Sequence, residues 1–487
     1  MSFIFLLGGL VLGWSLGANN TADIFGTAVG TRMVKLRTAL IVASIFVVLG
    51  AVLQGSNTTK SIGELGRINA IGGAFTVCLA TGLTVIWMTR AGFLVSITQA
   101  LVGGIVGWTI FSGDFINTSS LGQIFEAWVI SPLIAFVLAL LLFKLAHSKI
   151  IRVKLNLFTI DYYFRLAFIT LGALGAFSFG ANNIANIVGV YIFSNPFKNL
   201  YLSGLNISAY QLLIFIGSLS ISAGILTGSE KVMKTVGERI LKLSPLAGLV
   251  VVLTQSIVLL IFSSDIIKKV LVFLHLPPLP LVPISSSQVV IGAMIGIGIA
   301  RGGGRLVNFG VLKHIVLAWV ITPIAAGILS FFMLYFAQNV FQIVVKYPVR
   351  YQIDRVVIEK LKSEGLDTSQ LRKVSEKVYP NGRMLKMELQ RISNYSRGEI
   401  NRIIDISRID SIIVDSTKLN ELPEKWFTPV ETEALKNLHG RKYAHAWQMW
   451  EDLSGAEYFI NYETRKDSTE LRKKRELLTF LFRHTYK

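Results

Sequence analysis

Two segments of the chain carry the same cluster of amide side chains. Residues 17–23 read GANNTAD and residues 180–186 read GANNIAN, and apolar sequence flanks each of them. An asparagine offers two N–H donors and one carbonyl acceptor, so these segments could hydrogen-bond an anion or coordinate a cation. The asparagines concerned are Asn19, Asn20, Asn182 and Asn183. A second interpretation is a packing motif, because Gly and Ala allow helices in a membrane to approach closely.

Hydroxyl groups form a second pair of clusters. Residues 95–103 read VSITQALVG and residues 284–292 read ISSSQVVIG. Hydroxyls and amides can hydrogen-bond a tetrahedral oxyanion without holding it as tightly as Arg does, which suits a site that must release its ligand. The candidate residues are Ser96, Thr98, Gln99, Ser285, Ser286, Ser287 and Gln288. The alternative is that these side chains bond to carbonyls of their own helices.

One carboxylate lies inside the first asparagine motif. Asp23 is flanked by apolar residues, and Asn186 stands at the matching position of the second motif. A carboxylate at membrane depth is costly and therefore indicates a functional site. We expect Asp23, with Asn186, to bind a coupling cation, either a sodium ion or a proton. The alternative is that Asp23 caps a helix.

The sequence around these residues favours membrane helices. Hydrophobic residues make up 52% of the chain and charged residues only 16%, whereas soluble domains carry about 25% charge. We expect ten to twelve membrane elements, with a retained first helix. Apolar runs long enough to span or re-enter a membrane lie near residues 2–17, 38–54, 70–88, 93–112, 124–146, 164–180, 186–195, 210–228, 246–263, 285–300 and 312–345.

The helices that enter the two asparagine motifs are expected to break there. A break at membrane depth is tolerated where it lines a cavity or is buried in protein, and paired broken helices indicate the substrate site of a transporter. A break would also expose N–H groups at a helix N-terminus, which attract anions.

The motifs recur in the same order in both halves of the chain. After the asparagine and hydroxyl motifs, residues 128–132 read WVISP and residues 319–323 read WVITP. Three ordered pairs indicate an internal duplication, the usual plan of secondary transporters. We therefore expect an all-α membrane protein of two inverted homologous repeats with broken helices or hairpins, residues 1–150 and 151–345. Residues 346–487 are more charged and predict a soluble, mostly helical domain.

Several functional classes are disfavoured. The single cysteine, Cys78, allows no disulfide or zinc motif, and the six His residues form no HxxxH pair. Residues 301–305 (RGGGR) lack the Lys-Ser/Thr ending of a nucleotide-binding loop, so neither an enzyme nor an ATP-driven pump is expected. The net charge of +19 is typical of basic loops that set membrane topology, and the basic run at 472–475 is interpreted as a solvated helix face. Nucleic-acid binding is not expected.

These motifs resemble the inorganic phosphate transporter family, the Pit-type permeases related to the animal sodium–phosphate symporters. The family signature GANDVANAFGTSVG is similar to residues 17–30, and PVSTTHALVG-like hairpins of the family are similar to residues 95–103 and 283–292. The resemblance covers residues 1–345. It implies a secondary transporter that moves phosphate together with sodium ions or protons and has no cofactor other than a sodium ion.

The chain departs from the family pattern at the cation-binding positions. The usual aspartate of the signature is Asn20 in the first motif and Asn183 in the second, while Asp23 stands where the family has its second asparagine. The family's histidine after the hydroxyls is Gln99 and Gln288. The anion-binding elements are therefore kept, while the carboxylates are fewer, which leaves the coupling stoichiometry open.

The expected function is secondary active transport of inorganic phosphate across the cell membrane by a multi-pass protein, coupled to sodium or protons through alternating access. The alternatives are a sulfate permease of the same family, an anion channel, and an anion-sensing membrane protein that signals through its C-terminal domain. The sequence leaves homo-oligomer formation open.

Overall fold

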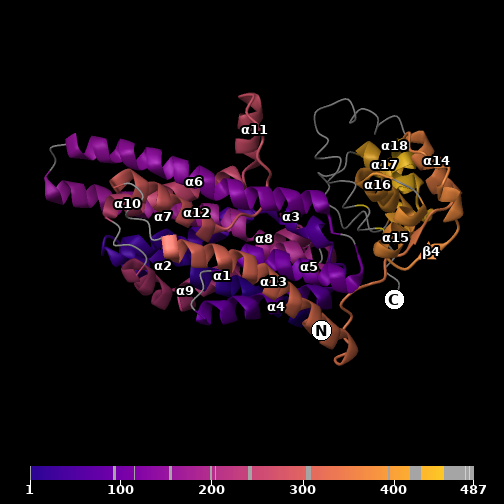
Figure 1. Cartoon of the computed structure of the whole chain (residues 1–487), viewed down its shortest axis with the longest axis horizontal. Coiled ribbons are helices and arrows are strands. Elements are labelled where there is room, and N and C mark those ends of the chain that lie inside the picture. The colour runs from indigo at the N-terminus through magenta and orange to yellow at the C-terminus, as the bar shows by residue number, and fades with distance from the viewer. Residues whose placement is uncertain are drawn as a thin grey trace. The chain divides into compact units, whose positions relative to one another are not determined.

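The protein is mostly helical in a computed structural model of the chain (Figure 1). The structure describes residues 2–91, 95–114, 116–152, 156–197, 200–202, 205–239, 244–302, 309–392, 395–416, 429–454, 478 and 482. The basic run at 472–475 lies outside these residues. The chain forms two compact units. The first comprises Met1–Ser112, Ile116–Phe197 and Tyr210–Lys346, and the second comprises Gly113–Phe115, Lys198–Ala209 and Tyr347–Lys487.

The first unit, called the membrane unit below, consists of helices from both halves of the chain. Those of the first half are η1 (Ser2–Leu6), α1 (Leu7–Gly30), α2 (Leu36–Gln54), α3 (Ser56–Gly66), α4 (Ile71–Arg90), α5 (Ile97–Ser112) and α6 (Thr118–Arg152). Those of the second half are α7 (Leu157–Asn183), α8 (Ala185–Val188), η2 (Gly189–Ser194), α9 (Ala209–Arg239), α10 (Pro245–Ile261), α11 (Asp265–Phe273), α12 (Ser286–Gly302) and α13 (Phe309–Asn339).

Among the described residues, seven helices are long and apolar enough to cross a membrane, or eight if α10 and α11, bent by 80°, form one span. Two shorter apolar helices, α5 and α12, accompany them. The expected ten to twelve membrane elements are reached only at the lower limit, and only if these short helices are counted. One reason is that the apolar runs at 164–180 and 186–195 lie in a single candidate span, Phe158–Ser194.

The expected helix break is absent from the first asparagine motif, because α1 continues through residues 17–23 without interruption. In the second motif α7 ends at Asn183, and only Ile184, whose φ of −57° and ψ of −28° are still helical, separates it from α8. The glycines serve close packing instead. A Cβ on Gly17 would lie 2.0 Å from the carbonyl oxygen of Ile221, and one on Gly180 would lie 2.1 Å from that of Val47.

Equivalent close contacts occur in both halves with their partners exchanged. A Cβ on Gly103 in α5 would lie 2.0 Å from the carbonyl oxygen of Pro323 in α13. Likewise, a Cβ on Gly292 in α12 would lie 2.3 Å from the carbonyl oxygen of Pro132 in α6. Each short helix thus packs against the long proline-containing helix of the other half. These reciprocal contacts support the duplication read from the motifs; the inverted orientation and the repeat boundaries stay predictions.

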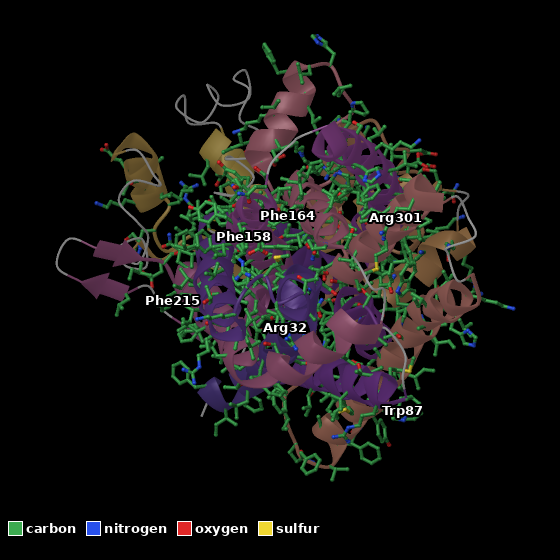
Figure 2. All side chains as sticks on the ribbon, turned by 90° about the vertical axis from the view of Figure 1, so that its left-hand side faces the viewer. Arg32, Trp87, Phe158, Phe164, Phe215 and Arg301 are labelled. Carbon is green, nitrogen blue, oxygen red and sulfur yellow. The ribbon has the colours of Figure 1, made fainter. Side chains whose placement is uncertain are left out.

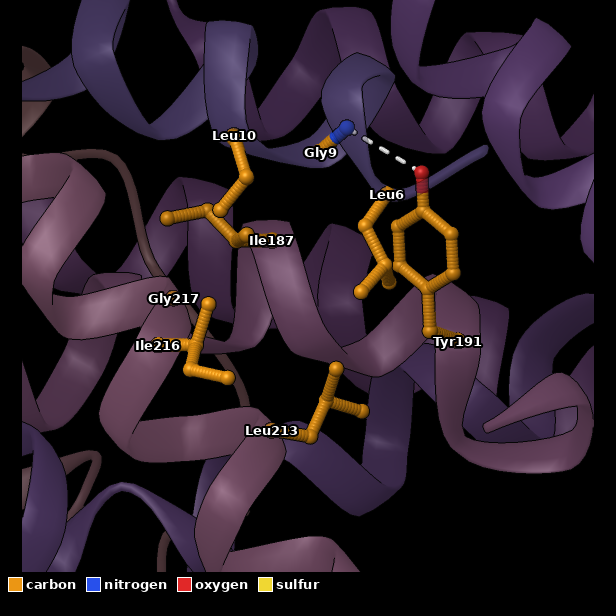
Figure 3. Close-up of a pocket in the computed structure, with 8 residues that line it drawn as sticks. All are labelled: Leu6, Gly9, Leu10, Ile187, Tyr191, Leu213, Ile216 and Gly217. Carbon is orange, nitrogen blue, oxygen red and sulfur yellow. Dashed lines mark hydrogen bonds between the residues drawn. The ribbon is translucent and has the colours of Figure 1, made fainter. Parts of the chain in front are cut away.

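A tyrosine hydroxyl interrupts the hydrogen-bond ladder at the start of the chain. Tyr191 of η2 accepts a hydrogen bond from the Gly9 N–H at 3.1 Å (Figure 3). It also donates one to the Phe5 carbonyl at 2.9 Å. Gly9 and Phe5 are four residues apart, so the hydroxyl occupies the place of an ordinary helical bond. Insertion of a side chain into this ladder is a known cause of helix bending, and it accounts for the change from η1 to α1. Apolar residues line the pocket beside the ring: Leu6, Leu10, Ile187, Leu213, Ile216 and Gly217.

The second unit contains short helices and three two-stranded antiparallel sheets. Its elements are β1 (Leu200–Leu202), β2 (Leu205–Ile207), β3 (Tyr351–Gln352), α14 (Arg355–Ser363), η4 (Leu371–Lys373), β4 (Val378–Tyr379), α15 (Gly382–Ile392), α16 (Arg397–Ser407), β5 (Ile412–Ile413), α17 (Pro429–Asn437), β6 (Lys442–Tyr443) and α18 (Ala446–Ser454). Strand β1 pairs with β2, β3 with β4, and β5 with β6. The sequence did not indicate these sheets, because strands of two or three residues leave no alternating pattern.

Two apolar cores stabilise this unit. Leu361, Leu385 and Ile403 belong to one core, and Leu435 and Met449 belong to the other. A surface ion pair joins α14 and α16, since two nitrogens of Arg402 donate to the two carboxylate oxygens of Glu364 at 2.8 and 2.6 Å. These hydrogen bonds lower the pKa of the Glu364 carboxyl group. The predicted solubility of residues 346–487 is not tested by this arrangement.

We expect Gly103→Ala to destabilise the protein. The added methyl group would meet the Pro323 carbonyl, and overpacking of this kind typically costs about 1–3 kcal/mol. Gly82→Ala in α4 is the matched control, because nothing lies within 4 Å of its added Cβ and Ala favours helix over Gly by up to about 1 kcal/mol. Thermal unfolding of the purified variants should therefore give a lower Tm for the first and an equal or higher Tm for the second. An unchanged Tm for Gly103→Ala would contradict the close packing of α5 on α13.

We expect Tyr191→Phe to change hydrogen exchange near the N-terminus with only a small loss of stability. Without the hydroxyl, the Gly9 N–H can bond directly to the Phe5 carbonyl, so the net loss should be near the value of one hydrogen bond, about 1 kcal/mol. Hydrogen–deuterium exchange of residues 2–10 measures the effect. Tyr210→Phe, which removes a hydroxyl bonded to the Ser56 carbonyl, is the control. Identical exchange at residues 2–10 in wild type and Tyr191→Phe would rule out the inserted hydroxyl.

Candidate anion site

The first asparagine motif is linked to the second hydroxyl cluster. The Asn20 side-chain amide donates to the Ser286 hydroxyl at 2.7 Å, a bond between residues 266 positions apart in the chain. Asn19 instead donates to the Ser15 hydroxyl of its own helix at 3.3 Å. Helix α1 therefore presents Asn20 to the start of α12, while Asn19 is engaged within α1.

The second asparagine motif contacts both hydroxyl clusters. Asn186 donates to the Thr98 hydroxyl at 3.0 Å and to the Asn183 carbonyl oxygen at 3.2 Å. Asn182 accepts a hydrogen bond from the Ile284 backbone N–H at 3.1 Å. All three asparagines are buried. The end of α7 and the beginning of α8 thus bring the starts of α5 and α12 to one place.

Ser96 and Ser285 are the N-caps of the two short helices. Each hydroxyl accepts a hydrogen bond at 3.3 Å from the backbone N–H three residues later, that of Gln99 in α5 and that of Gln288 in α12. Ser285 and Ser287 hydroxyls also lie 3.1 Å apart. These bonds differ from the alternative stated for the hydroxyl clusters, in which the side chains would donate to carbonyls of their own helices. A capping hydroxyl keeps its own hydrogen for donation, so the cap does not prevent contact with an anion.

Unpartnered polar atoms gather on these same residues. Within the part of the chain that the structure describes, no hydrogen-bond partner exists for Gln99 Oε1, Gln288 Oε1, Asn182 Nδ2 or Asn186 Oδ1, and each of these atoms is buried. Buried polar groups without a partner are rare in native proteins and indicate a missing water or ligand. These four atoms are therefore free to bind a water molecule or a polar ligand.

Asp23 is not a helix cap. It lies well inside α1, which begins at Leu7 and ends at Gly30, three residues after Asn20 and hence on a neighbouring position of the same face. In the described part of the chain no three His, Cys, Asp or Glu side chains come together. A sodium ion at Asp23 would thus be completed by neutral oxygens from amide, hydroxyl or carbonyl groups.

A threonine that sequence reasoning missed braces the second asparagine motif. The buried Thr58 of α3 donates to the Ala181 carbonyl at 3.1 Å. The other missed contact is the Tyr191 hydroxyl, which links η2 to the start of α1. Neither residue belongs to a repeated motif, so nothing in the sequence marks it as a partner of one.

Basic side chains lie beyond the ends of the two helices that share the Asn20–Ser286 bond. Arg32 follows α1, and Arg301 lies in the last turn of α12 with its guanidinium carbon 5.9 Å from the Phe143 ring centroid. Figure 2 shows both residues in the view toward this end of the membrane unit. Positive charge at such an end raises the local concentration of anions.

Comparison with known proteins indicates the family of the chain. The sequence profile of the phosphate transporter family matches residues 16–330. A Thermococcus kodakarensis protein described as a phosphate permease is 25% identical over 405 residues and aligns with 68% of this chain and 96% of its own length. A Bacillus subtilis protein described as a low-affinity inorganic phosphate transporter is 29% identical over 329 residues, 65% of this chain and 92% of its own length.

A solved structure shares the fold. A protein described as the sodium-dependent phosphate transporter superimposes with a TM-score of 0.55 at 23% sequence identity, covering 69% of this chain and 98% of that chain. The match is too distant in sequence to assign roles to individual residues. Since the family profile covers more than half of the chain, this multi-pass membrane protein belongs to the phosphate transporter family.

Proposed function

We propose that this protein carries inorganic phosphate across the cell membrane by secondary active transport driven by a sodium gradient. The observation that carries the proposal is the set of side-chain bonds between the two halves, Asn20–Ser286 and Asn186–Thr98. Residues of the same motifs carry buried amide atoms that have no partner of their own among the described residues. Donors from neutral side chains can bind a phosphate oxygen and release it again.

The position of the site supports alternating access. Asn20 belongs to the long helix α1 of the first half, and Asn186 belongs to α8, which follows the long helix α7 of the second half. The hydroxyls belong to the starts of the short helices α5 and α12. A ligand there would contact both halves at once, and rocking of one half against the other would open the site to either side. The starts of α5 and α12 add helix N-terminal N–H groups, which favour an anion.

Two observations support sodium as the coupling ion: the solved relative is described as sodium-dependent, and the site contains Asp23. Burying a cation in a low-dielectric medium costs many kcal/mol unless its charge is offset. Asp23 is the only carboxylate in the paired motifs, so it is the natural counter-charge, with Asn186 at the matching position of the other half. Protons are the alternative coupling ion, and no comparison favours sulfate as the cargo.

The first test is uptake into proteoliposomes that contain the purified protein. We expect radiolabelled phosphate to accumulate when an inward sodium gradient is imposed and to stop when the gradient is collapsed. Sulfate in excess should compete weakly. Uptake that depends on a proton gradient instead would identify the proton as the coupling ion. Sulfate uptake without phosphate uptake would contradict the proposed cargo, and downhill flux unaffected by either gradient would indicate a channel.

The second test separates coupling from anion binding. Asp23→Asn should abolish the sodium dependence of uptake while changing phosphate binding in detergent much less, because the variant loses the charge that offsets the cation. Glu126→Gln removes an exposed carboxylate of α6 and should behave as wild type. Sodium-driven uptake by Asp23→Asn at the wild-type level would place the cation site elsewhere.

A further inference from the structure

Among the described residues of the membrane unit, one glutamine has both of its side-chain polar atoms fully buried and without a partner. Gln255 of α10 has 0% exposure, and neither its Nε2 nor its Oε1 forms a hydrogen bond. In Gln99 and Gln288, by contrast, only the oxygen is both fully buried and without a partner. A primary amide buried in this way costs free energy, so its presence is best explained by a group that binds it.

Two neighbours on α10 locate the Gln255 side chain. Val251, four residues earlier, packs in a cluster with Val290 and Ala293 of α12. Val252, three residues earlier, lies 3.4 Å from the position of a Cβ on Gly175 of α7. Residues three and four apart share a helix face, so Gln255 lies on the side of α10 between α7 and α12.

These two helices carry the candidate anion site. Helix α7 ends with Asn182 and Asn183, and α12 begins with Ser286. Helix α1, which carries Asn20, is also adjacent, because Ile24 lies 3.1 Å from the same Gly175 Cβ position. Gln255 is therefore on the one face of α10 that is directed toward the helices of the site.

The chemistry favours an anion as the ligand of Gln255. The amide nitrogens of Asn20, Asn183 and Asn186 already donate to protein oxygens. Among the side-chain amide nitrogens in the described part of the chain that are themselves fully buried, Asn182 Nδ2 and Gln255 Nε2 have no acceptor. A tetrahedral oxyanion accepts hydrogen bonds from several directions. These two N–H donors would therefore act together with the O–H donors of the serine and threonine side chains.

We propose that Gln255 is a substrate-binding residue of the transport site and that its Nε2 donates a hydrogen bond to a phosphate oxygen. This proposal rests on the proposed function. It extends the site to a helix that carries none of the paired motifs, so the anion would be held by three elements of the second half, the α7 end, the α10 face and the α12 start, together with α1 and α5 of the first half.

The experiment compares phosphate uptake and thermal stability in purified Gln255→Leu. Leucine keeps a similar size but has no donor. We expect the phosphate half-saturation concentration to rise about ten- to a hundredfold, as for the loss of a hydrogen bond to a charged ligand. The Tm without phosphate should be unchanged or higher, because an unpartnered polar group has been removed. Gln255→Met serves the same purpose should the leucine variant fold poorly. Unchanged uptake kinetics in either folded variant would overturn the proposal, as would a lower Tm with unchanged half-saturation.

Gln255→Glu distinguishes the anion from the cation as the ligand. The carboxylate replaces a donor with a negative acceptor, so we expect a larger loss of phosphate affinity than in the leucine variant and no change in sodium half-saturation. Tighter sodium binding with normal phosphate affinity would assign Oε1 to the cation and overturn the proposal.

Ser330→Ala is the matched control for these variants. Ser330 of α13 is also buried without a partner, but it belongs to the helix that packs near Gly107 and Phe111, toward the far end of α5 from Thr98. Its removal should leave phosphate uptake unchanged. Failure of wild-type protein to take up phosphate would contradict the proposed function itself, whereas normal wild-type uptake with an unaffected Gln255→Leu would contradict only the role of Gln255.

Discussion

Close backbone contact at glycines is the constraint on which the membrane unit depends. Helices in lipid gain little from hydrophobic association with one another, so they associate where small residues allow tight packing. Gly17 and Gly180 bring α1 against α9 and α7 against α2, and Gly103 and Gly292 bring α5 against α13 and α12 against α6. These contacts set the depth of each helix. Only with the helices at that depth can Asn20 reach Ser286 across 266 residues of chain.

The glycines therefore explain why the asparagine motifs can be both structural and functional. In residues 17–20 the glycine faces a neighbouring backbone while Asn20 faces a hydroxyl of another helix. The packing interpretation and the binding interpretation of the motif are therefore compatible, because neighbouring positions of one helix contact different partners. An unbroken α1 holds Asn20 in a fixed position opposite Ser286, as the proposed recognition of a small anion by neutral groups requires.

The buried amide atoms without a hydrogen-bond partner lower the free energy of unfolding. Gln99, Gln288, Asn182 and Asn186 each leave one buried polar atom unbonded, and Gln255 leaves two. Most buried polar atoms in native proteins have a partner, so atoms of this kind indicate a bound water, an ion or a ligand. In a transporter the arrangement is reasonable, because donors and acceptors fully satisfied within the protein would have nothing to offer the cargo.

The sequence alone determined the class of protein and most of the candidate site. Apolar runs with few charges require lipid around them, and paired motifs in the same order point to duplicated halves and to residues such as Asn20, Ser286 and Thr98. Tertiary structure decided the rest. A glycine beside asparagines permits either a helix break or a close contact, and only the carbonyl of Ile221 opposite Gly17 shows which occurs. Tyr191 and Gln255 belong to no repeated motif, so only the folded chain indicates their importance. The Tyr191 hydroxyl bonds to the backbone at Gly9 and Phe5. The Gln255 side chain is buried without any partner among the described residues.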